Sequence, residues 1–290
     1  MKILVTGAGG VVGSYLAREL AREHNVVGTI HNTIPKGVEI IDKLWKIDLS
    51  MDMLPEQTFD VIIHVAALLY GNTEDLVRNN ITATQRLIDY ALRTKTKRFI
   101  YISTVSVYGQ VEGELEESTQ KKCDESYGLT KLIAENLVVE SNIEEKLIIR
   151  LPRMLSEDMK LDIEHSGMCK MIKQLLDDAD VVCDIPFELY NNYMHVSQLH
   201  KFVERQLYRK NWEKMCETVN LGATQNITMY EILDALKKGM DSNAKILTKA
   251  KTERTMCARV NVKKAVQMGL EVIDEVAMLE RFAENLTKRR

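Results

Sequence analysis

Lys2-Ile3-Leu4-Val5-Thr6-Gly7-Ala8-Gly9-Gly10-Val11-Val12-Gly13 is the stretch of sequence that decides the fold. A short apolar run leads into a turn with glycines at 7, 10 and 13, and a segment of helical character follows. This order of strand, glycine loop and helix is typical of the first unit of a dinucleotide-binding fold. The glycines allow a sharp turn close to a pyrophosphate, and the helix start supplies unpaired N–H groups and a positive dipole. We therefore expect a dinucleotide to be bound by Gly7, Gly9, Gly10, Val11, Val12 and Gly13.

The same alternation of short apolar runs and longer helical segments continues through the first half of the chain. It predicts strands at 2–5, 26–30, 44–47, 61–65, 98–102 and 146–151, and helices that include 10–23, 73–94 and 127–140. Nearly continuous apolar strands separated by helices indicate a parallel sheet that is covered on both faces. With right-handed crossovers, the prediction is an α/β fold with a Rossmann-type, doubly wound parallel sheet.

The regular alternation ends at residue 151, where a stretch rich in Met, Lys and Asp begins. We expect a smaller, mostly helical C-terminal lobe there, which binds substrate. Segments 193–196 and 218–221 are expected to form short strands that return to the first lobe. The predicted division is therefore a dinucleotide-binding domain of 1–151 with 193–221, and a substrate-binding lobe of 152–192 and 222–290.

Composition excludes several classes of protein. The chain has 290 residues, of which 28% are charged, and its 39 basic and 42 acidic residues are mixed along its length, so it offers no basic field for nucleic acid. Its five cysteines form no Cys-x-x-Cys pair, which argues against a disulfide framework or a zinc site and favours reduced thiols in the cytoplasm. No stretch approaches the roughly 20 apolar residues that a membrane span needs. We expect a cytoplasmic protein without a metal site.

The end of the second strand predicts the cofactor's phosphorylation state. An acidic residue there would bind the adenosine ribose hydroxyls and repel a 2′-phosphate. This chain has His31 and Asn32 at that point, and no carboxylate follows before Glu39. The sequence therefore favours NADP over NAD. Asp48 and Leu49, after the third strand, are expected to contact the adenine edge, with a solvated strand-end carboxylate as the alternative for Asp48.

Tyr127 and Lys131 are four residues apart at the start of a predicted helix, so their side chains share one face. They follow Thr104, which stands at the carboxyl end of the fifth strand, where open α/β sheets bind ligands. A free tyrosine has a pKa near 10, so positive charge must stabilise its phenolate if it is to act as a base at neutral pH. We expect Lys131 to contribute that charge.

With these blocks in place, the chain resembles the extended short-chain dehydrogenases/reductases, the NAD-dependent epimerase/dehydratase family that mostly acts on nucleotide sugars. The matching blocks are Val5-Thr6-Gly7-Ala8-Gly9-Gly10-Val11-Val12-Gly13, Ile63-His64-Val65-Ala66-Ala67, Ile102-Ser103-Thr104-Val105-Ser106-Val107-Tyr108-Gly109, Ser126-Tyr127-Gly128-Leu129-Thr130-Lys131 with Glu135, and Val219-Asn220-Leu221-Gly222.

The resemblance implies a role for each matching position. Tyr127 would exchange a proton with the substrate oxygen, Thr104 would hydrogen-bond the same oxygen, and Lys131 would also hold the nicotinamide ribose. The other implied contacts are Ala66 and Ala67 at the adenine and ribose side, Asn80 at the nicotinamide and Ser106 at the substrate. His64 is expected to be a core histidine whose nitrogens are both hydrogen-bonded.

Two departures from the family pattern affect the predicted reaction. The family commonly shows Arg-x-Phe-Ile-His-Val-Asp-Asp, whereas this chain reads Asn191-Asn192-Tyr193-Met194-His195-Val196-Ser197-Gln198, so Arg254 becomes the candidate for pairing with a diphosphate. Dehydratases of the family have an Asp-Glu pair after the catalytic threonine, and Val105-Ser106 stands here instead.

The main prediction is therefore NAD(P)H-dependent reduction of a keto group on a nucleotide-linked deoxysugar. The alternatives are a nucleotide-sugar epimerase that retains NAD, and a non-catalytic NAD(P)-binding sensor or interaction protein. By resemblance we also expect a homodimer formed through helices 73–94 and 127–140.

Overall fold

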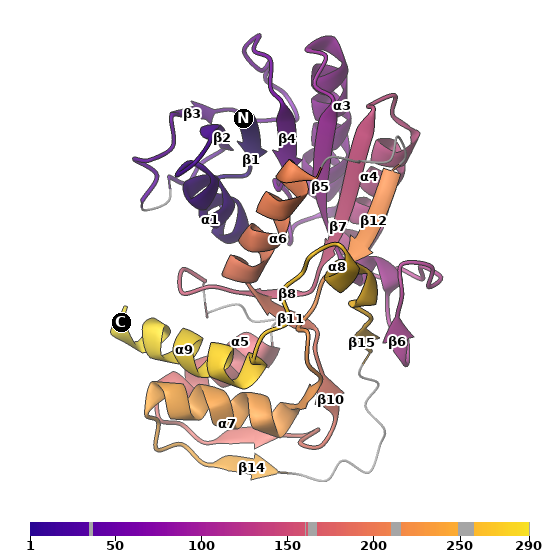
Figure 1. The fold of residues 1–290 in the computed structure, drawn as a ribbon. Coiled ribbons are helices and arrows are strands. Elements are labelled where there is room, and N and C mark those ends of the chain that lie inside the picture. The colour runs from indigo at the N-terminus through magenta and orange to yellow at the C-terminus, as the bar shows by residue number, and fades with distance from the viewer. Residues whose placement is uncertain (35–36, 160, 162–166, 210–215, 249–257, 290) are drawn as a thin grey trace.

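The computed structural model describes residues 1–34, 37–159, 161, 167–209, 216–248 and 258–289. Its centre is a sheet of seven parallel strands in the order β12-β7-β5-β4-β1-β2-β3 (Figure 1). The strands are β1 (Lys2–Thr6), β2 (Asn25–Ile30), β3 (Lys43–Lys46), β4 (Val61–His64), β5 (Arg98–Thr104), β7 (Glu145–Leu151) and β12 (Cys216–Asn220). The predicted doubly wound α/β fold is confirmed. The strand order reverses between β1 and β4, so the crevice at their carboxyl ends is where this fold binds ligands.

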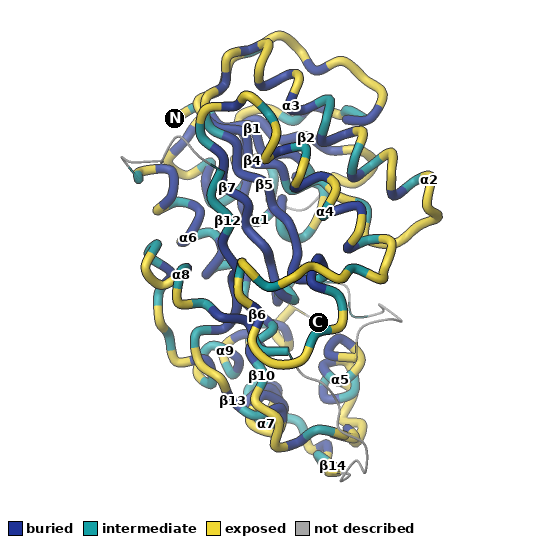
Figure 2. The backbone as a smooth tube through the Cα atoms, turned by 90° about the vertical axis from the view of Figure 1, so that its right-hand side faces the viewer, coloured by how far each residue is buried: buried dark blue, intermediate teal, exposed yellow. Residues whose placement is uncertain are grey.

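Helices cover both faces of the sheet because its strands are apolar on both faces. On β1, Ile3 and Val5 pack in a core with α1 (Val11–Leu20) and α6 (Val196–Tyr208), whereas Leu4 packs in a second core with α3 (Ala83–Arg93) and α4 (Ser126–Glu140). Figure 2 shows the strands buried between these helices. The period of two along each strand therefore determines which side chain faces which helix layer.

The predicted helix 73–94 is three consecutive segments. They are α2 (Thr73–Leu76), a π-helical segment η1 (Val77–Thr82) and α3. The Thr84 hydroxyl donates to the carbonyl oxygen of Asn80 at 2.6 Å, a contact that bends helices. The wider turn carries Asn80, and short π-helical segments of this kind often occur at functional sites.

The two predicted returning strands have different outcomes. β12 joins the central sheet beside β7, as predicted for 218–221. The predicted strand at 193–196 is also present, but β11 (Tyr193–His195) pairs outside the central sheet with β8 (Arg153–Leu155). Met194 of β11 packs in the core of α1 and α6, and α6, which begins directly after β11, packs against α1.

A third core holds the elements of the second lobe together below the sheet in Figure 1. These are α5 (Gly167–Leu176), α7 (Met229–Met240), α9 (Glu275–Lys288), the pair β9 (Val181–Cys183) and β14 (Ile246–Thr248), and the pair β10 (Leu189–Tyr190) and β13 (Ile227–Thr228). The predicted division assigned all of 222–290 to this lobe. However, α8 (Lys263–Gln267) packs Ala265 into the core of α1 and α6.

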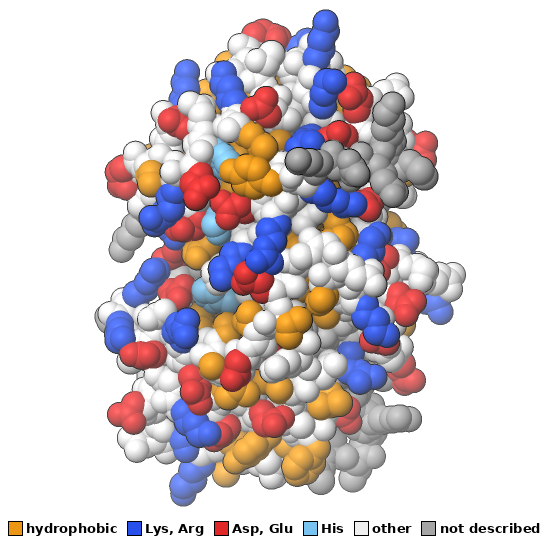
Figure 3. All heavy atoms as spheres, viewed as in Figure 1, with side chains coloured by type: hydrophobic (Ala, Val, Ile, Leu, Met, Phe, Trp, Pro, Cys, Tyr) orange, Lys and Arg blue, Asp and Glu red, His pale blue; other side chains and the backbone are white. Residues whose placement is uncertain are grey.

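Three short elements lie near the carboxyl ends of the strands: the 3-10 helix η2 (Val105–Tyr108), and β6 (Glu114–Leu115) paired with β15 (Arg259–Val260). On the face drawn in Figure 3, acidic and basic side chains are interspersed. Within the described ranges, no helix is long and apolar enough to span a membrane, and no cluster of His, Cys, Asp or Glu could hold a metal ion.

Candidate active site

The glycine loop has the backbone shape that a pyrophosphate needs. Gly7 has φ +71°, and a Cβ there would lie 2.7 Å from the backbone of Ala66, so only glycine fits between β1 and the end of β4. Gly10 precedes α1 and cannot cap it with a side chain, and the first turn holds no acidic residue. The N–H groups of that turn therefore have a positive dipole and no side-chain acceptor at Gly10. These residues fit the pyrophosphate of a dinucleotide.

His64 ties the ends of β1 and β4 together as a neutral side chain. Thr6 Oγ1 accepts from the N–H groups of Val65 and Ala66 at 3.2 Å, so its own proton goes to His64 Nδ1 at 2.7 Å. Thr84 Oγ1 gives its proton to Asn80 O and accepts from His64 Nε2 at 2.9 Å. Burial lowers the pKa of His64 to about 3, with a further contribution from Lys131. The hydrogen-bond network thus assigns the Nε2–H tautomer, and the expected core histidine is what the structure has.

Asn80 connects the loop after β4 to the helix that carries Tyr127. It is fully buried, and its amide accepts from Leu68 N at 2.7 Å and donates to Leu68 O at 2.9 Å. The same Nδ2 donates to Thr130 Oγ1 at 3.0 Å, and that hydroxyl donates to the carbonyl oxygen of Tyr127. The amide oxygen and both Nδ2 protons of Asn80 are therefore used by Leu68 and Thr130, and Asn80 supports the site by holding loop and helix together.

Thr104 and Ser106 lie directly against the start of α4. Thr104 Oγ1 accepts from Ser106 N at 3.1 Å and donates to Ser106 Oγ at 3.1 Å, which caps η2. A Cβ on Gly128 would lie 2.6 Å from Ser106 O, so the backbones of η2 and α4 touch there. The predicted catalytic residues Thr104 and Tyr127 are thus on two elements in direct contact.

Lys131 is buried beneath this contact, with 1% of its surface exposed. Its Nζ donates to Ile102 O at 2.7 Å and lies 4.1 Å from the centre of the Tyr101 ring. Burial lowers the pKa of Lys131 to about 7, although Glu135 opposes this change. Burial also raises the pKa of Tyr127 to about 12, with a contribution from Tyr70. Tyr127 is thus a neutral phenol at neutral pH, and the ammonium of Lys131 is hydrogen-bonded to Ile102 O.

The adenosine end of the crevice differs from the sequence interpretation. His31 is exposed, as is Asn32, which contacts it at 3.3 Å. Asp48 Oδ2 lies 3.7 Å from His31 Nε2, so a carboxylate does stand at this edge, from the neighbouring strand β3. Burial opposes ionisation of Asp48, but hydrogen bonds from Ser50 and the nearby His31 hold its pKa below the usual range. Leu49 is buried in the core beneath α3, which argues against its expected contact with adenine.

The residue in place of the family's arginine has a structural role. Asn191 is buried, accepts from Val260 N at 2.8 Å, and donates to Val260 O at 2.8 Å and Ala223 O at 3.3 Å. It joins β15 to the segment after β12. Arg254, the other candidate for a diphosphate, lies outside the described residues.

Sequence reasoning missed two residues of this region. Tyr70 follows the anchored Leu68 and influences Tyr127, and nothing in its sequence context distinguishes it. Arg150 is buried at the end of β7 and pairs with Glu135. Its signal was present, because a charged residue in the apolar run 146–151 needs a buried partner.

Comparison with known proteins identifies the family of this chain. The model of the NAD dependent epimerase/dehydratase family matches residues 3–193. YtcB of Bacillus subtilis, named as an uncharacterized UDP-glucose epimerase, is 27% identical over 264 residues, which cover 82% of this chain and 81% of that protein. D-erythronate dehydrogenase of Haemophilus influenzae is 24% identical over 278 residues, covering 84% of this chain and 87% of that one.

Solved structures share the whole fold. The UDP-glucuronic acid 4-epimerase of Bacillus cereus in complex with NAD superimposes with a TM-score of 0.84 at 24% identity, covering 100% of this chain and 99% of that one. The UDP-Glc/GlcNAc 4-epimerase of Campylobacter jejuni gives 0.82 at 18% identity with the same coverage. On the family match, which extends from the glycine loop to β11, this chain belongs to the NAD dependent epimerase/dehydratase family.

Proposed function

We propose that the protein is an NAD-dependent epimerase of a nucleotide-linked sugar. The observation that supports this proposal is the contact between η2 and α4, where a Cβ on Gly128 would lie 2.6 Å from Ser106 O, because Thr104 caps η2 and Tyr127 stands at the start of α4. This contact lies at the carboxyl ends of the parallel strands, the same end of the sheet as the glycine loop. The named relatives support the epimerase alternative better than the reductase that the sequence favoured.

The chain's own residues have distinct roles in this proposal. Bound NAD supplies the hydride chemistry at the sugar carbon. Tyr127 Oη takes the proton of the sugar hydroxyl and later returns it, while the Thr104 hydroxyl turns from Ser106 Oγ to donate a hydrogen bond to the same oxygen. Because Tyr127 has a pKa of about 12 here, it can act as a base only when positive charge reaches it. Lys131 is the candidate for that charge, and its ammonium would have to move toward the phenol.

We propose NAD, not NADP, as the cofactor. The sequence argument for NADP required that no carboxylate stand near His31, but Asp48 lies 3.7 Å from its Nε2. A carboxylate there would repel a 2′-phosphate. The solved B. cereus epimerase holds NAD.

We also propose that the second lobe holds the part of the substrate that is remote from the reacting carbon. A cavity of ≈ 450 Å³ lies there, lined by residues that include Lys170, Met171, Cys183 and Met229. Its volume is in the range of small-molecule sites. Charge reversal by Lys170→Glu is expected to raise KM for an anionic substrate with little change in kcat.

A second candidate function is oxidation of a small sugar acid. It is favoured by the buried role of Asn191 where the family commonly has an arginine and by the likeness to D-erythronate dehydrogenase. An enzyme of this kind needs no diphosphate clamp.

One experiment separates the two. The purified protein is incubated with NAD and, separately, UDP-glucose, UDP-glucuronic acid, UDP-N-acetylglucosamine or D-erythronate. Epimerisation gives a new sugar nucleotide without net formation of NADH, whereas dehydrogenation gives NADH in proportion to product. Retention of every substrate without either change would contradict the proposed function.

We further propose that the protein is a cytoplasmic homodimer. Leu129, Ile133 and Val139 on α4 and Val77 in η1 are exposed apolar side chains, on the helices for which the family resemblance predicts dimerisation. The four cysteines of the described part are free thiols, as expected in a reducing compartment.

A further inference from the structure

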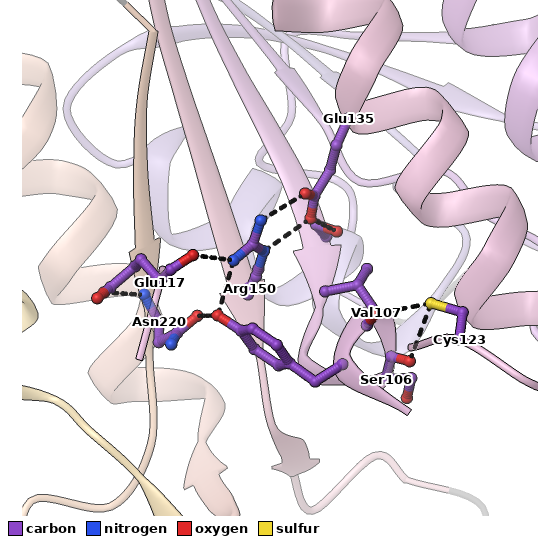
Figure 4. Close-up of polar contacts among 9 residues, drawn as sticks. Ser106, Val107, Glu117, Cys123, Glu135, Arg150 and Asn220 are labelled. Atoms are coloured by element: carbon purple, nitrogen blue, oxygen red, sulfur yellow. Dashed lines mark hydrogen bonds and ion pairs between the residues drawn. The ribbon is translucent and has the colours of Figure 1, made fainter. Parts of the chain in front are cut away.

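A buried ion pair lies directly behind the candidate active site. Glu135, on α4, accepts from Arg150 Nε at 3.0 Å and from Arg150 Nη2 at 2.7 Å, and both side chains are 3% exposed. The Ser103 hydroxyl also donates to Glu135 Oε1. Figure 4 shows the Arg150 guanidinium between Glu135 on one side and Glu117 and Asn220 on the other. The fork of Arg150 matches the carboxylate in the strong bidentate geometry.

Further contacts fix the guanidinium in place. Arg150 Nη1 donates to Tyr108 OH at 2.7 Å and to Glu117 O at 3.3 Å. Tyr108 OH in turn donates to Asn220 Oδ1 at 2.7 Å. The pair therefore connects α4, β5, η2, β7 and β12 at the ends that form the site.

Glu135 could pair with either of two cations, Lys131 or Arg150. Glu135 follows Lys131 by four residues, so the two side chains share a face of α4 and could form an ion pair. Within the described chain, the ion pair of Glu135 is with Arg150, and Lys131 Nζ donates to Ile102 O. Arg150 thus keeps the nearest carboxylate on the helix away from Lys131.

We propose that Arg150 is a positioning residue for the reaction: by binding Glu135 it holds Ser103 and the Thr104 end of β5 in place and leaves Lys131 without a carboxylate partner. The effect of Arg150 on catalysis rests on the proposed function, whereas its effect on Glu135 and Lys131 does not. Because Glu135 is paired with Arg150, the ammonium of Lys131 has to leave its hydrogen bond with Ile102 O, and not an ion pair with Glu135, to turn toward Tyr127 and bound cofactor.

The charged and titratable groups around Lys131 come from each element packed on it. They are Tyr127 and Glu135 on α4, Tyr101 on β5, His64 on β4 and Arg150 on β7. His64 is neutral, and both tyrosines have a raised pKa because they are buried. Burial is the largest influence on the pKa of Lys131, and Glu135 is the member of this set that opposes it.

The test is an NMR titration of Lys131 in the cofactor-free protein, with ¹³C-labelled lysine side chains and the resonance assigned by Lys131→Met. In Arg150→Met, the released Glu135 can pair with Lys131, so the pKa of Lys131 should rise by about one pH unit or more. In Glu135→Gln the negative charge is lost, and the pKa should fall. Arg150→Lys separates the release of Glu135 from the simple loss of a positive charge, because it keeps the charge and loses the bidentate fork.

The matched control is Arg98→Met. Arg98 pairs with Glu145 across the same strands, β5 and β7, at their amino ends, and its removal should leave the titration of Lys131 unchanged. Arg150→Lys keeps the charge but not the fork, so it should give a smaller rise and serves if Arg150→Met does not fold.

An unchanged pKa of Lys131 in the folded Arg150 variants would overturn the proposal, as would a change in the same direction in Glu135→Gln. Since this readout needs neither cofactor nor substrate, it stands even if the proposed epimerase activity is absent. If that activity is present, Arg150→Met should lower kcat by about tenfold or more with KM little changed, since positioning acts in the transition state.

Discussion

Replacement of Lys131 by methionine should stabilise the protein at neutral pH while abolishing turnover. Lys131 is fully buried, and burial lowers its pKa from 10.5 to about 7. At 1.36 kcal/mol per pH unit, this difference corresponds to about 5 kcal/mol that the folded state loses by burying the charge below pH 7. Because the unfolded chain binds the extra proton between pH 7 and 10.5, the free energy of unfolding of the wild type rises with pH in that window.

The methionine variant lacks this cost and has a different one. It fills similar space, but it leaves Ile102 O without the hydrogen bond from Lys131, which costs about 1–3 kcal/mol. The variant should therefore be more stable than the wild type by about 2–4 kcal/mol at pH 6.5. The advantage should shrink as pH rises and reverse near the ordinary lysine pKa.

Urea unfolding followed by circular dichroism at pH 6.5, 8.0 and 9.5 measures the difference. A constant difference between the two proteins across these pH values would refute the reasoning, because it would mean that Lys131 does not titrate differently on folding. Loss of stability in the variant at pH 6.5 would do the same.

Three further outcomes follow from the structure. Gly128→Ala should reduce turnover by about a hundredfold with cofactor binding retained, because its Cβ would lie 2.6 Å from Ser106 O and displace the start of α4 from η2; near-normal kcat would contradict the proposed contact. Asp48→Asn should move the ratio of NAD to NADP affinity about tenfold toward NADP, since the charge beside His31 is removed, and equilibrium binding of both cofactors measures it. The double variant Leu129→Glu with Ile133→Glu places charges on the exposed face of α4 and should give a monomer in sedimentation velocity with the fold intact; an unchanged dimer would place the interface elsewhere.

The parallel sheet could be predicted from the sequence because its strands are local features. Runs such as 61–65 and 98–102 are apolar on both faces, and the structure has β4 and β5 there to within two residues. The glycine loop could also be predicted, because the strand, the glycines and the helix follow one another directly in the sequence. In the structure Gly7 has a positive φ and lies against Ala66.

The features that could not be predicted from the sequence depend on contacts between distant segments. β11 has the composition of a strand, but its partner β8 could not be inferred from periodicity. Asp48 was expected at the adenine edge, but its position 3.7 Å from His31 depends on how the loop after β3 packs beside the end of β2, which the sequence of β2 alone does not reveal. The π-helical turn at Asn80 depends on the hydrogen bonds of one threonine and one loop, which no helical pattern reveals.

The predicted catalytic residues were only partly accessible to sequence analysis. The spacing of Tyr127 and Lys131 predicted one helical face, and both are on α4. However, the direction of the Lys131 ammonium depends on Ile102 O and on the engagement of Glu135 by Arg150. Ile102 is on β5 and Arg150 is on β7. The spacing of Tyr127 and Lys131 along the chain therefore could not show where the ammonium lies relative to the phenol.

The central claim is that Tyr127 performs proton exchange in an NAD-dependent epimerisation. The most direct measurement follows UDP-glucose, UDP-glucuronic acid and UDP-N-acetylglucosamine by proton NMR with NAD and the wild-type protein, and then with Tyr127→Phe. The account predicts that one substrate equilibrates with its epimer without accumulation of NADH, and that the phenylalanine variant retains NAD binding but is slower by at least about a hundredfold. Equal rates in the two proteins would contradict the role of Tyr127, and accumulation of NADH with an oxidised product would replace the epimerase with a dehydrogenase.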